Sequence, residues 1–282
     1  MIRLTVIVSL IVTILQYLGV VGWLSEVLTP VFKFIGLPGE ASLVFISGFF
    51  VNIYSAVAVV ATLDLSVRAI TILAVMGLCA HNMIVETAVQ KKTGSSAVRM
   101  VLLRTLSAFI LGYLLHLIMP ESSAMVAAED AVPADAGWGQ VLLLWLKSTA
   151  MLILKMGVLI LSLNIIQRIL GEFGVIRWLS KLFRPILKVF GLPARTSFLW
   201  IIANTLGLAY GSAVMIEECE QGKISKEDAD LLNHHIAISH SNLEDVLLFV
   251  SVGGLVWWIL LSRWIWAAVV VWVRRLELLV RK

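Results

Sequence analysis

Charged residues are scarce in this chain, and their scarcity excludes most water-soluble folds. Asp, Glu, Lys and Arg make up 14% of the 282 residues, whereas hydrophobic residues make up 60%. A soluble domain normally has about 25% charged residues. Because the mean hydropathy is +0.97, most of the surface must face lipid, and the sequence predicts a polytopic membrane protein.

Cysteines and catalytic motifs are also scarce or missing. Cys79 and Cys219 are the only cysteines, too few for a disulfide framework or for a tetrahedral zinc site of their own. The sequence contains no Walker motif, nucleophile elbow or HExxH motif, so we do not expect an enzyme. The net charge is +4, but the basic residues cluster between apolar runs, and no nucleic-acid partner is expected.

One stretch of twenty residues occurs twice in the chain. Residues 19–38 and 174–193 are identical at ten of twenty positions, including the Gly-Leu-Pro sequence that ends each stretch. The amphipathic pattern before this sequence predicts a helix that lies in the membrane interface. We therefore expect two copies of one unit, over residues 1–119 and 140–282, joined by an acidic external loop over residues 120–139.

Each copy contains three apolar runs long enough to cross a bilayer. The crossings are expected at about 4–23, 65–90 and 97–119 in the first copy, and at 140–168, 231–250 and 253–273 in the second. Residues 42–63 and 196–216 are apolar but interrupted by Gly, Asn and Ser. We interpret these two segments as re-entrant helical hairpins, whose exposed backbone must be satisfied by protein or water.

The positions of Lys and Arg distinguish this topology from one with eight crossings. With six crossings, sixteen basic residues lie on one side of the membrane and two, Lys33 and Arg68, on the other; eight crossings give ten against eight at best. The positive-inside rule favours six, with both termini in the cytoplasm. We expect the membrane to be a bacterial inner membrane. Since three crossings are an odd number, the second copy would be inverted, an arrangement common in secondary transporters.

The predicted fold class is therefore an all-α polytopic membrane protein with two inverted-topology repeats. Each repeat would have three transmembrane helices, an interfacial helix and a re-entrant helical hairpin.

Ionisable residues recur near the middle of two of the predicted crossings. His81-Asn82-x-x-x-Glu86 in the first copy matches His240-Ser241-x-x-x-Asp245 in the second. A charged residue at mid-bilayer costs at least ~2.5–3.5 kcal/mol, so such residues usually face a cavity or a partner. We expect these motifs and the hairpin breaks to form a midplane site for a substrate or ion. Its predicted residues are His81, Asn82, Glu86, His240, Ser241, Asn242, Glu244, Asp245, Asn52, Ser47, Asn204 and Thr205.

Structural explanations of the same residues stay open. A histidine in an apolar run can be a hydrogen-bonded packing residue, and the hairpin glycines can serve only close helix packing. Of the basic residues within the crossings, Lys155 and Arg263 lie deep and are expected to neutralise carboxylates. Arg104 and Lys147 lie nearer the ends, where we expect their side chains to reach the interface.

A divalent metal is an alternative substrate. Imidazole and carboxylate groups are ligands for Fe²⁺, Mn²⁺ or Zn²⁺, and the candidate metal ligands are His81, Glu86, His240, Glu244 and Asp245. A coupling ion or such a metal is the sole cofactor under consideration. His234-His235 with residues 217–220 could also form a metal entry site, although we interpret that region as a solvated loop.

These motifs resemble those of the nucleoside-recognition, or Gate, domain family. The resemblance rests on the interfacial helix that ends in Gly-Leu-Pro, the polar hairpin tips at Ser47-Gly48 and Asn204-Thr205, and the His81-Asn82-x-x-x-Glu86 centre. Related folds are those of concentrative nucleoside transporters, the membrane core of ferrous iron transporter B and spore maturation proteins A and B. The Gln-Thr-Glu-type hairpin motif of nucleoside transporters is replaced here, and the GTPase domain of the iron transporter is absent.

The leading functional hypothesis is a secondary transporter of a small polar solute or ion, nucleoside-like or cationic, coupled to protons or a cation. A divalent metal transporter is one alternative, and a non-transporting membrane scaffold, which the resemblance to spore maturation proteins implies, is another. The expected partners are the lipid bilayer and the transported solute, and a homo-oligomer is left open.

Overall fold

Helices make up nearly all of the regular structure. The computed structural model describes residues 2–122, 124–126 and 137–280. Elements of the first half are α1 (Ile2–Tyr17), α2 (Val20–Phe34), α3 (Ala41–Phe50), α4 (Ile53–Val60), β1 (Leu65–Ser66), α5 (Val67–Ala80), α6 (Met83–Lys92), α7 (Ala97–Ile118) and β2 (Met125–Val126). Elements of the second half are α8 (Trp138–Glu172), α9 (Val175–Val189), the short 3₁₀ helix η1 (Ala194–Thr196), α10 (Ser197–Thr205), α11 (Leu208–Glu220), α12 (Lys226–Ser239), α13 (Asp245–Ser251) and α14 (Val256–Val280).

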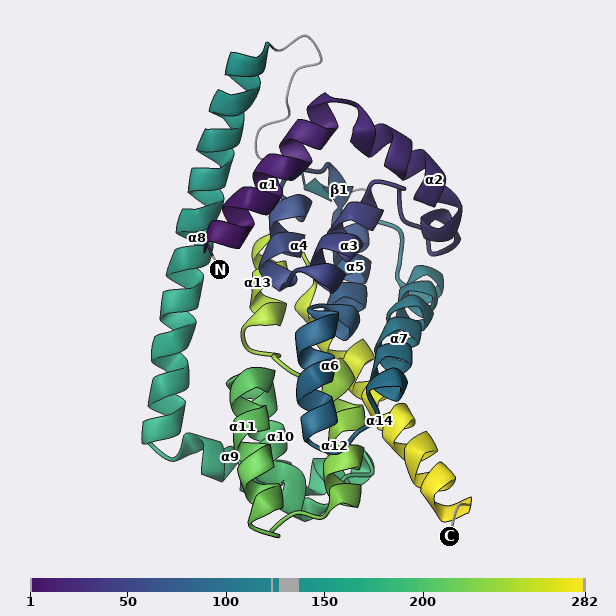
Figure 1. Ribbon diagram of the computed structural model, residues 1–282, viewed down its shortest axis with the longest axis vertical. Helices are drawn as coiled ribbons and strands as arrows, with labels where there is room; N and C mark the ends of the chain where they lie inside the picture. The colour runs from purple at the N-terminus through teal and green to yellow at the C-terminus, as the bar shows by residue number, and fades with distance from the viewer. Residues whose placement is uncertain (1, 123, 127–136, 281–282) are drawn as a thin grey trace.

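The helices form an elongated bundle with related elements at its two ends (Figure 1). Helix α2 lies at the upper end of the view and α9 at the lower end, while α8 runs along one side over much of the height. Helices α5 and α12 meet near the middle. Helix α5 is buried along almost its whole length, so the core of the bundle surrounds it.

The surface is suited to contact with lipid. Helices α7, α8 and α14 are long and apolar enough to cross a membrane, and the bent pair α5–α6 would be a fourth crossing. On α8, Leu143, Leu154 and Leu161 are each more than half exposed, which would be unfavourable in water. The all-α membrane architecture is therefore confirmed. The count of six crossings stays a prediction, because α1 has only 16 residues and α12 and α13 are separate helices.

The expected external loop over residues 120–139 falls largely on residues 123 and 127–136, which lie outside the described residues. The part nearest α7 is ordered by β2, which pairs antiparallel with β1 so that Leu65 is opposite Val126. This short pair ties the segment after α7 to the start of α5.

The two amphipathic helices end in the same way. Gly36 and Gly191 adopt φ of 69° and 77°, a conformation that glycine reaches without strain. The following Leu37 and Leu192 donate backbone hydrogen bonds to Phe32 and Leu187, with N···O distances of 2.9 and 2.8 Å. This capping pattern satisfies carbonyls that the helix end leaves free, and the next residue in both copies is proline, which cannot continue the helix. The sequence-based helix ends are thus confirmed.

The interrupted segments form pairs of short helices, α3 with α4 and α10 with α11. Small residues allow each pair to pack closely. A Cβ added to Gly48 would lie 3.2 Å from the Cβ of Ala56, and one added to Gly211 would lie 3.1 Å from the Cα of Ala203. The same contact therefore occurs in both pairs with the glycine on opposite partners.

The interpretation of residues 217–220 and His234-His235 as a solvated loop is wrong. Helix α11 continues to Glu220, and α12 begins at Lys226 after Ser225. The Ser225 hydroxyl accepts a hydrogen bond from the backbone N–H of Asp228 at 3.1 Å, a favourable N-terminal cap. His234 and His235 are consequently buried in α12, not solvated, because the apolar residues beside them pack into the bundle.

Candidate binding site at the helix breaks

The site lies where two helices are interrupted. We expected continuous helices over residues 65–90 and 231–250, but α5 stops at His81 and α12 stops at His240. Asn82 and Ser241, which follow, have φ of 44° and 53°, a left-handed conformation that turns the chain out of a helix. Sequence periodicity alone cannot reveal such a turn.

Hairpin carbonyls stabilise both breaks. The N–H of Asn82 donates to the carbonyl of Gly48 at 2.9 Å, and the N–H of Ser241 donates to the carbonyl of Ala203 at 3.0 Å. These carbonyls lie near the C-terminal ends of α3 and α10, where a helix leaves acceptors free. Each break and its neighbouring hairpin therefore satisfy polar backbone groups that lipid could not.

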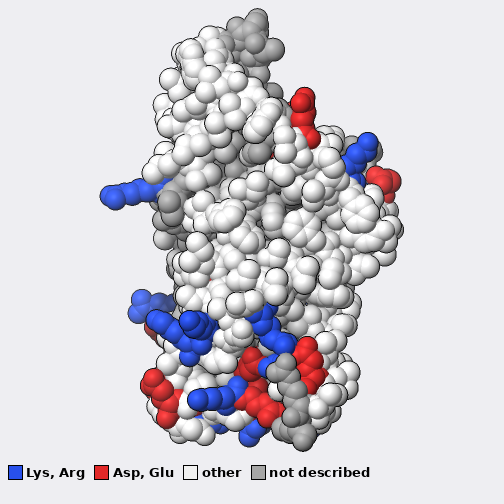
Figure 2. Space-filling view, turned by 45° about the vertical axis from the view of Figure 1, so that its right-hand side comes forward, with Lys and Arg blue, Asp and Glu red and all other residues white. Residues whose placement is uncertain are grey.

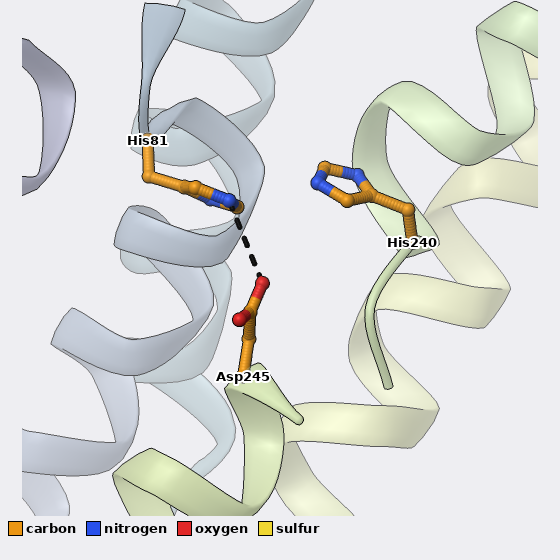
Figure 3. Close-up of side chains that lie close together, drawn as sticks. All are labelled: His81, His240 and Asp245. Atoms are coloured by element: carbon orange, nitrogen blue, oxygen red, sulfur yellow. Dashed lines mark ion pairs between the residues drawn. The ribbon is translucent and has the colours of Figure 1, made fainter. Parts of the chain in front are cut away.

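The two histidines are oriented alike. Nδ1 of His81 lies 3.1 Å from the carbonyl oxygen of Gly77, and Nδ1 of His240 lies 2.6 Å from that of Ile236. Because a carbonyl oxygen only accepts hydrogen bonds, Nδ1 carries the proton in both rings. Nε2 of each ring is then the atom available to the site. The ring centroids are 5.2 Å apart, and the rings point toward one another (Figure 3).

The two carboxylates have different surroundings. Glu86 is 2.9 Å from Nε2 of His81, 3.2 Å from Nε2 of His240 and 2.7 Å from Nη2 of Arg104. Asp245 lies 3.5 Å from Nε2 of His81, the contact drawn in Figure 3, and no other ion pair of Asp245 occurs among the described residues. Both carboxylates are more than 90% buried. Glu86 is therefore held by several partners, whereas Asp245 is held loosely.

Two buried arginines donate hydrogen bonds to the C-terminal carbonyls of the interrupted helices. Arg104 on α7 donates to the carbonyls of Cys79 and His81, at 2.9 and 2.6 Å. Arg263 on α14 donates to the carbonyls of Ile238 and His240, at 2.7 and 2.8 Å. Both side chains are fully buried, so the expectation that Arg104 extends to the interface is wrong. The partners it finds in the core offset the cost of burying its charge.

The remaining predicted residues lie around this centre in two groups. Asn242 donates to the side-chain oxygen of Asn204 at 2.5 Å and accepts from Arg263 at 3.1 Å, while Glu244 accepts a hydrogen bond from the Tyr54 hydroxyl. The other three bond within their own helical segments. Asn52 caps α4 through the N–H of Ser55, at 3.0 Å, and the hydroxyls of Ser47 and Thr205 bond to backbone carbonyls three or four residues earlier.

Sequence reasoning missed Arg104 and Tyr54 as members of the site. A signal for the arginine was present, because Arg104 follows His81 by 23 residues and Arg263 follows His240 by the same 23. Tyr54 offered no such signal, since its contact with Glu244 joins residues 190 positions apart. Lys147 and Lys155 are exposed on α8, and the role of Lys155 in neutralising a carboxylate stays a prediction.

The chemistry of the centre suits a proton or a cation. Nε2 of His81 lies 2.9 Å from a Glu86 oxygen, and both atoms are acceptors when His81 is neutral and Glu86 is ionised, so this contact requires a proton on the imidazole Nε2 or on the carboxyl group. Donor atoms of His81, His240 and Asp245 all lie within 4.8 Å of one another. Imidazole nitrogen and carboxylate oxygen at such separations can accept a proton or, after small shifts, bind one positive ion.

The chain is similar in sequence to known membrane proteins. A model of the Gate family, described as nucleoside recognition, matches residues 1–125. The uncharacterized membrane protein YvoD of Bacillus subtilis (strain 168) is 34% identical over 262 residues, which cover 91% of this chain and 83% of that protein. No solved structure matches the chain significantly.

Proposed function

We propose that this chain, which belongs to the Gate (nucleoside recognition) family of membrane proteins, is a secondary transporter of a small polar solute or ion in the bacterial inner membrane. The single observation that carries the proposal is the buried cluster of His81, Glu86, His240 and Asp245 at paired helix breaks. Interrupted helices with ionisable groups at half depth are the usual construction of substrate and coupling-ion sites in such transporters.

The proposal treats the two halves as inverted repeats. Supporting it, α2 and α9 lie at opposite ends of the molecule (Figure 1). Residues separated by 159 positions also meet each other: the rings of His81 and His240 are adjacent, and Trp266 donates to the hydroxyl of Ser107 at 2.9 Å. Equivalent residues touch in this way where a two-fold axis relates two copies.

The distribution of charge supports one orientation. On the face in Figure 2, most charged side chains gather over the lower end of the molecule, below a broad and mostly uncharged surface. We call this lower end, which contains the α6–α7 connection and the last turns of α14, the charged end. By the positive-inside rule it faces the cytoplasm in this proposal.

In the proposed mechanism the substrate binds between the helix breaks and the hairpins. Glu86 and Asp245 exchange protons or a cation with the two histidines, and the loosely held Asp245 changes partner most readily. Arg104 and Arg263 keep the histidines in place, while the hairpins α3–α4 and α10–α11 open the site to one side at a time.

A divalent metal substrate is a second candidate, favoured by the orientation of the histidines. Both rings anchor Nδ1 on a backbone carbonyl, as ligating histidines in proteins usually do. Their Nε2 atoms then point to the same place as the Asp245 carboxylate. The site would take a substrate ion such as Fe²⁺, Mn²⁺ or Zn²⁺ through His81, His240, Asp245 and Glu86.

Uptake into proteoliposomes tests the proposal. The purified protein is assayed with an imposed proton gradient against panels of nucleosides and divalent metals, together with Glu86→Gln and Asp245→Asn. We expect flux of one panel member and loss of its coupling to protons in both variants. Glu172→Gln, which changes a carboxylate exposed on α8, is the control and should keep full flux.

The outcomes separate the candidates. Metal uptake together with metal binding by calorimetry would select the second candidate, and thermal stabilisation by a nucleoside would select an organic substrate. Wild-type protein that folds, yet moves no member of either panel, would overturn the transport proposal and leave a scaffold.

A further inference from the structure

A chain of buried polar groups extends from the charged end toward the central site. The amide nitrogen of Asn233 on α12 donates to the hydroxyls of Thr93 and Ser95, at 2.8 and 3.0 Å, in the connection between α6 and α7. Ser95 donates in turn to Asp230 at 2.7 Å, and Asp230 pairs with Arg274 at 2.8 Å. All but Arg274 are more than 90% buried, so the chain passes through the protein interior.

Gln90 continues this chain toward Glu86. Its backbone carbonyl accepts from the amide of Asn233 at 3.3 Å. Its side chain lies four residues after Glu86 on α6, hence on the same helical face. Gln90 is fully buried, and among the described residues neither its amide oxygen nor its amide nitrogen has a hydrogen-bond partner. Leaving such a group unsatisfied costs about 1–3 kcal/mol, and buried water normally satisfies it.

The equivalent positions at the opposite end of the molecule provide an internal comparison. The backbone of the α6–α7 connection recurs before α14: Gly94 and Gly253 have φ of 106° and 104°, and the N–H groups of Ser95 and Gly254 bond to the carbonyls of Gln90 and Phe249, at 3.0 and 2.8 Å. The residues equivalent to Gln90, Thr93 and Asn233 are Phe249, Val252 and Ala74. The fold can therefore be built with apolar residues at these positions.

The polar chain therefore lies between the two halves at one end of the molecule, and the backbone does not require it. At its outer end it reaches Arg274, which shares Glu277 with Arg99 at 2.9 and 2.6 Å. There it borders a cleft of about 220 Å³ that is lined by apolar residues of α7 and α14 and by Arg99, His234, Arg274 and Glu277. His234 is 2% exposed, and its Nε2 has no hydrogen-bond partner among the described residues. Water in this cleft would satisfy that nitrogen and connect the chain to solvent.

We propose that Gln90, Thr93, Ser95, Asn233 and Asp230 line a hydrated path through which protons reach Glu86 from the charged end. The inference rests on the proposed transport function and adds the route of the coupling proton. A proton enters as hydronium from the cleft, is passed along water molecules beside Asn233 and Gln90, and is accepted by a Glu86 oxygen, which leaves neutral water behind. Because the positions equivalent to Gln90, Thr93 and Asn233 are Phe249, Val252 and Ala74, we expect no matching path at the opposite end.

Cysteine accessibility tests the path independently of transport. In a background of Cys79→Ser and Cys219→Ser, Asn233→Cys and Thr93→Cys are treated with a small hydrophilic thiosulfonate reagent, with Ala74→Cys and Val252→Cys as the equivalent controls. We expect the first pair to react at least about tenfold faster than the second, and from the charged end alone. Equal rates in the two pairs would overturn the path.

A functional test uses Gln90→Leu, which keeps the side-chain size and removes the polar group, with Gln90→Ser as the variant that leaves room for water. Proton uptake should fall about tenfold or more in Gln90→Leu, equivalent to about 1.4 kcal/mol on the barrier, and recover in Gln90→Ser. Substrate binding, followed by thermal stabilisation, should persist in both, which shows that they fold.

Normal proton uptake in Gln90→Leu overturns the path while transport stands. Selective reactivity of Asn233→Cys in a protein that transports nothing overturns transport while the path stands.

Discussion

The two helix breaks share a backbone and differ in the side chains that they hold. In both, the N–H of a residue in the left-handed conformation donates a hydrogen bond to a hairpin carbonyl. An arginine donates hydrogen bonds to two carbonyls at the end of the preceding helix. Yet Glu86 lies within ion-pair distance of three groups, whereas Asp245 lies within that distance of one. The common contacts are those that the fold needs in lipid, and the differences lie in the groups that could carry a charge.

The largest expected effect concerns the orientation of the two halves. Lys33 and Lys188 are equivalent, exposed residues on α2 and α9. In a background without Cys79 and Cys219, Lys33→Cys and Lys188→Cys should react with an impermeant thiol reagent from opposite sides of the membrane, because inverted repeats place equivalent residues on opposite faces. Labelling both from one side in right-side-out and inside-out vesicles would contradict inversion.

Replacing each arginine should show how differently the two helix breaks contribute to the free energy of unfolding. Arg104→Met leaves Glu86 without its guanidinium partner and should lower the free energy of unfolding by about 3–5 kcal/mol. Arg263→Met removes charged hydrogen bonds without breaking a described ion pair, so we expect a loss of about 1.5–3 kcal/mol.

Unfolding in detergent with a chemical denaturant measures both changes. The double variant Arg104→Met/Glu86→Gln is the control and should regain part of the loss, since it no longer buries an unpaired carboxylate. Equal losses for the two single arginine variants would show that the Glu86 contact adds nothing.

The glycines that end α2 and α9 offer a milder comparison. Gly191→Ala places a side chain in a left-handed conformation and should cost about 1–2 kcal/mol. Gly36→Ala has the same strain, and its new Cβ would also lie 2.0 Å from Nδ1 of His116, so an additional loss of about 1–3 kcal/mol is expected. Thermal unfolding midpoints would reveal the order, and a larger shift for Gly191→Ala would show that His116 moves away freely.

The smallest effect is expected at the left-handed residues themselves. Ser241→Gly relieves about 1–2 kcal/mol of left-handed backbone strain and loses about 0.4–1 kcal/mol through the more flexible unfolded chain, so we expect a small net stabilisation, provided the hydroxyl has no structural role. Asn82→Gly should change stability less, because asparagine already tolerates this conformation. A loss of stability in Ser241→Gly, read from the same denaturant curves, would indicate that the hydroxyl itself is needed.

Much of the architecture was predictable from sequence because it depends on local patterns. Gly-Leu-Pro after an amphipathic run predicted where α2 and α9 end, and apolar composition predicted a helical membrane protein. The offset between His81 and His240 suggested that the two motifs meet, and the structure places them in contact.

The details that failed depend on partners distant in sequence. The turn at Asn82 is held by the carbonyl of Gly48, and that at Ser241 by the carbonyl of Ala203, so no periodicity within either run could reveal it. The burial of Arg104 likewise depends on acceptors on another helix, whereas hydropathy records only its position along its own helix. Tyr54 and Glu244 meet only after both halves have assembled.

The arginine contacts have a mechanical consequence. Arg104 joins α7 to the carbonyl end of α5, and Arg263 joins α14 to that of α12, so neither histidine can travel without its neighbouring long helix. Helices α5 and α7 would therefore move as one rigid unit and α12 and α14 as another, and the two units meet at the imidazoles of His81 and His240. A conformational change that exposes the central site would therefore take place in the short hairpins α3–α4 and α10–α11. Among the described residues, no arginine side chain donates to two carbonyls at the ends of these helices.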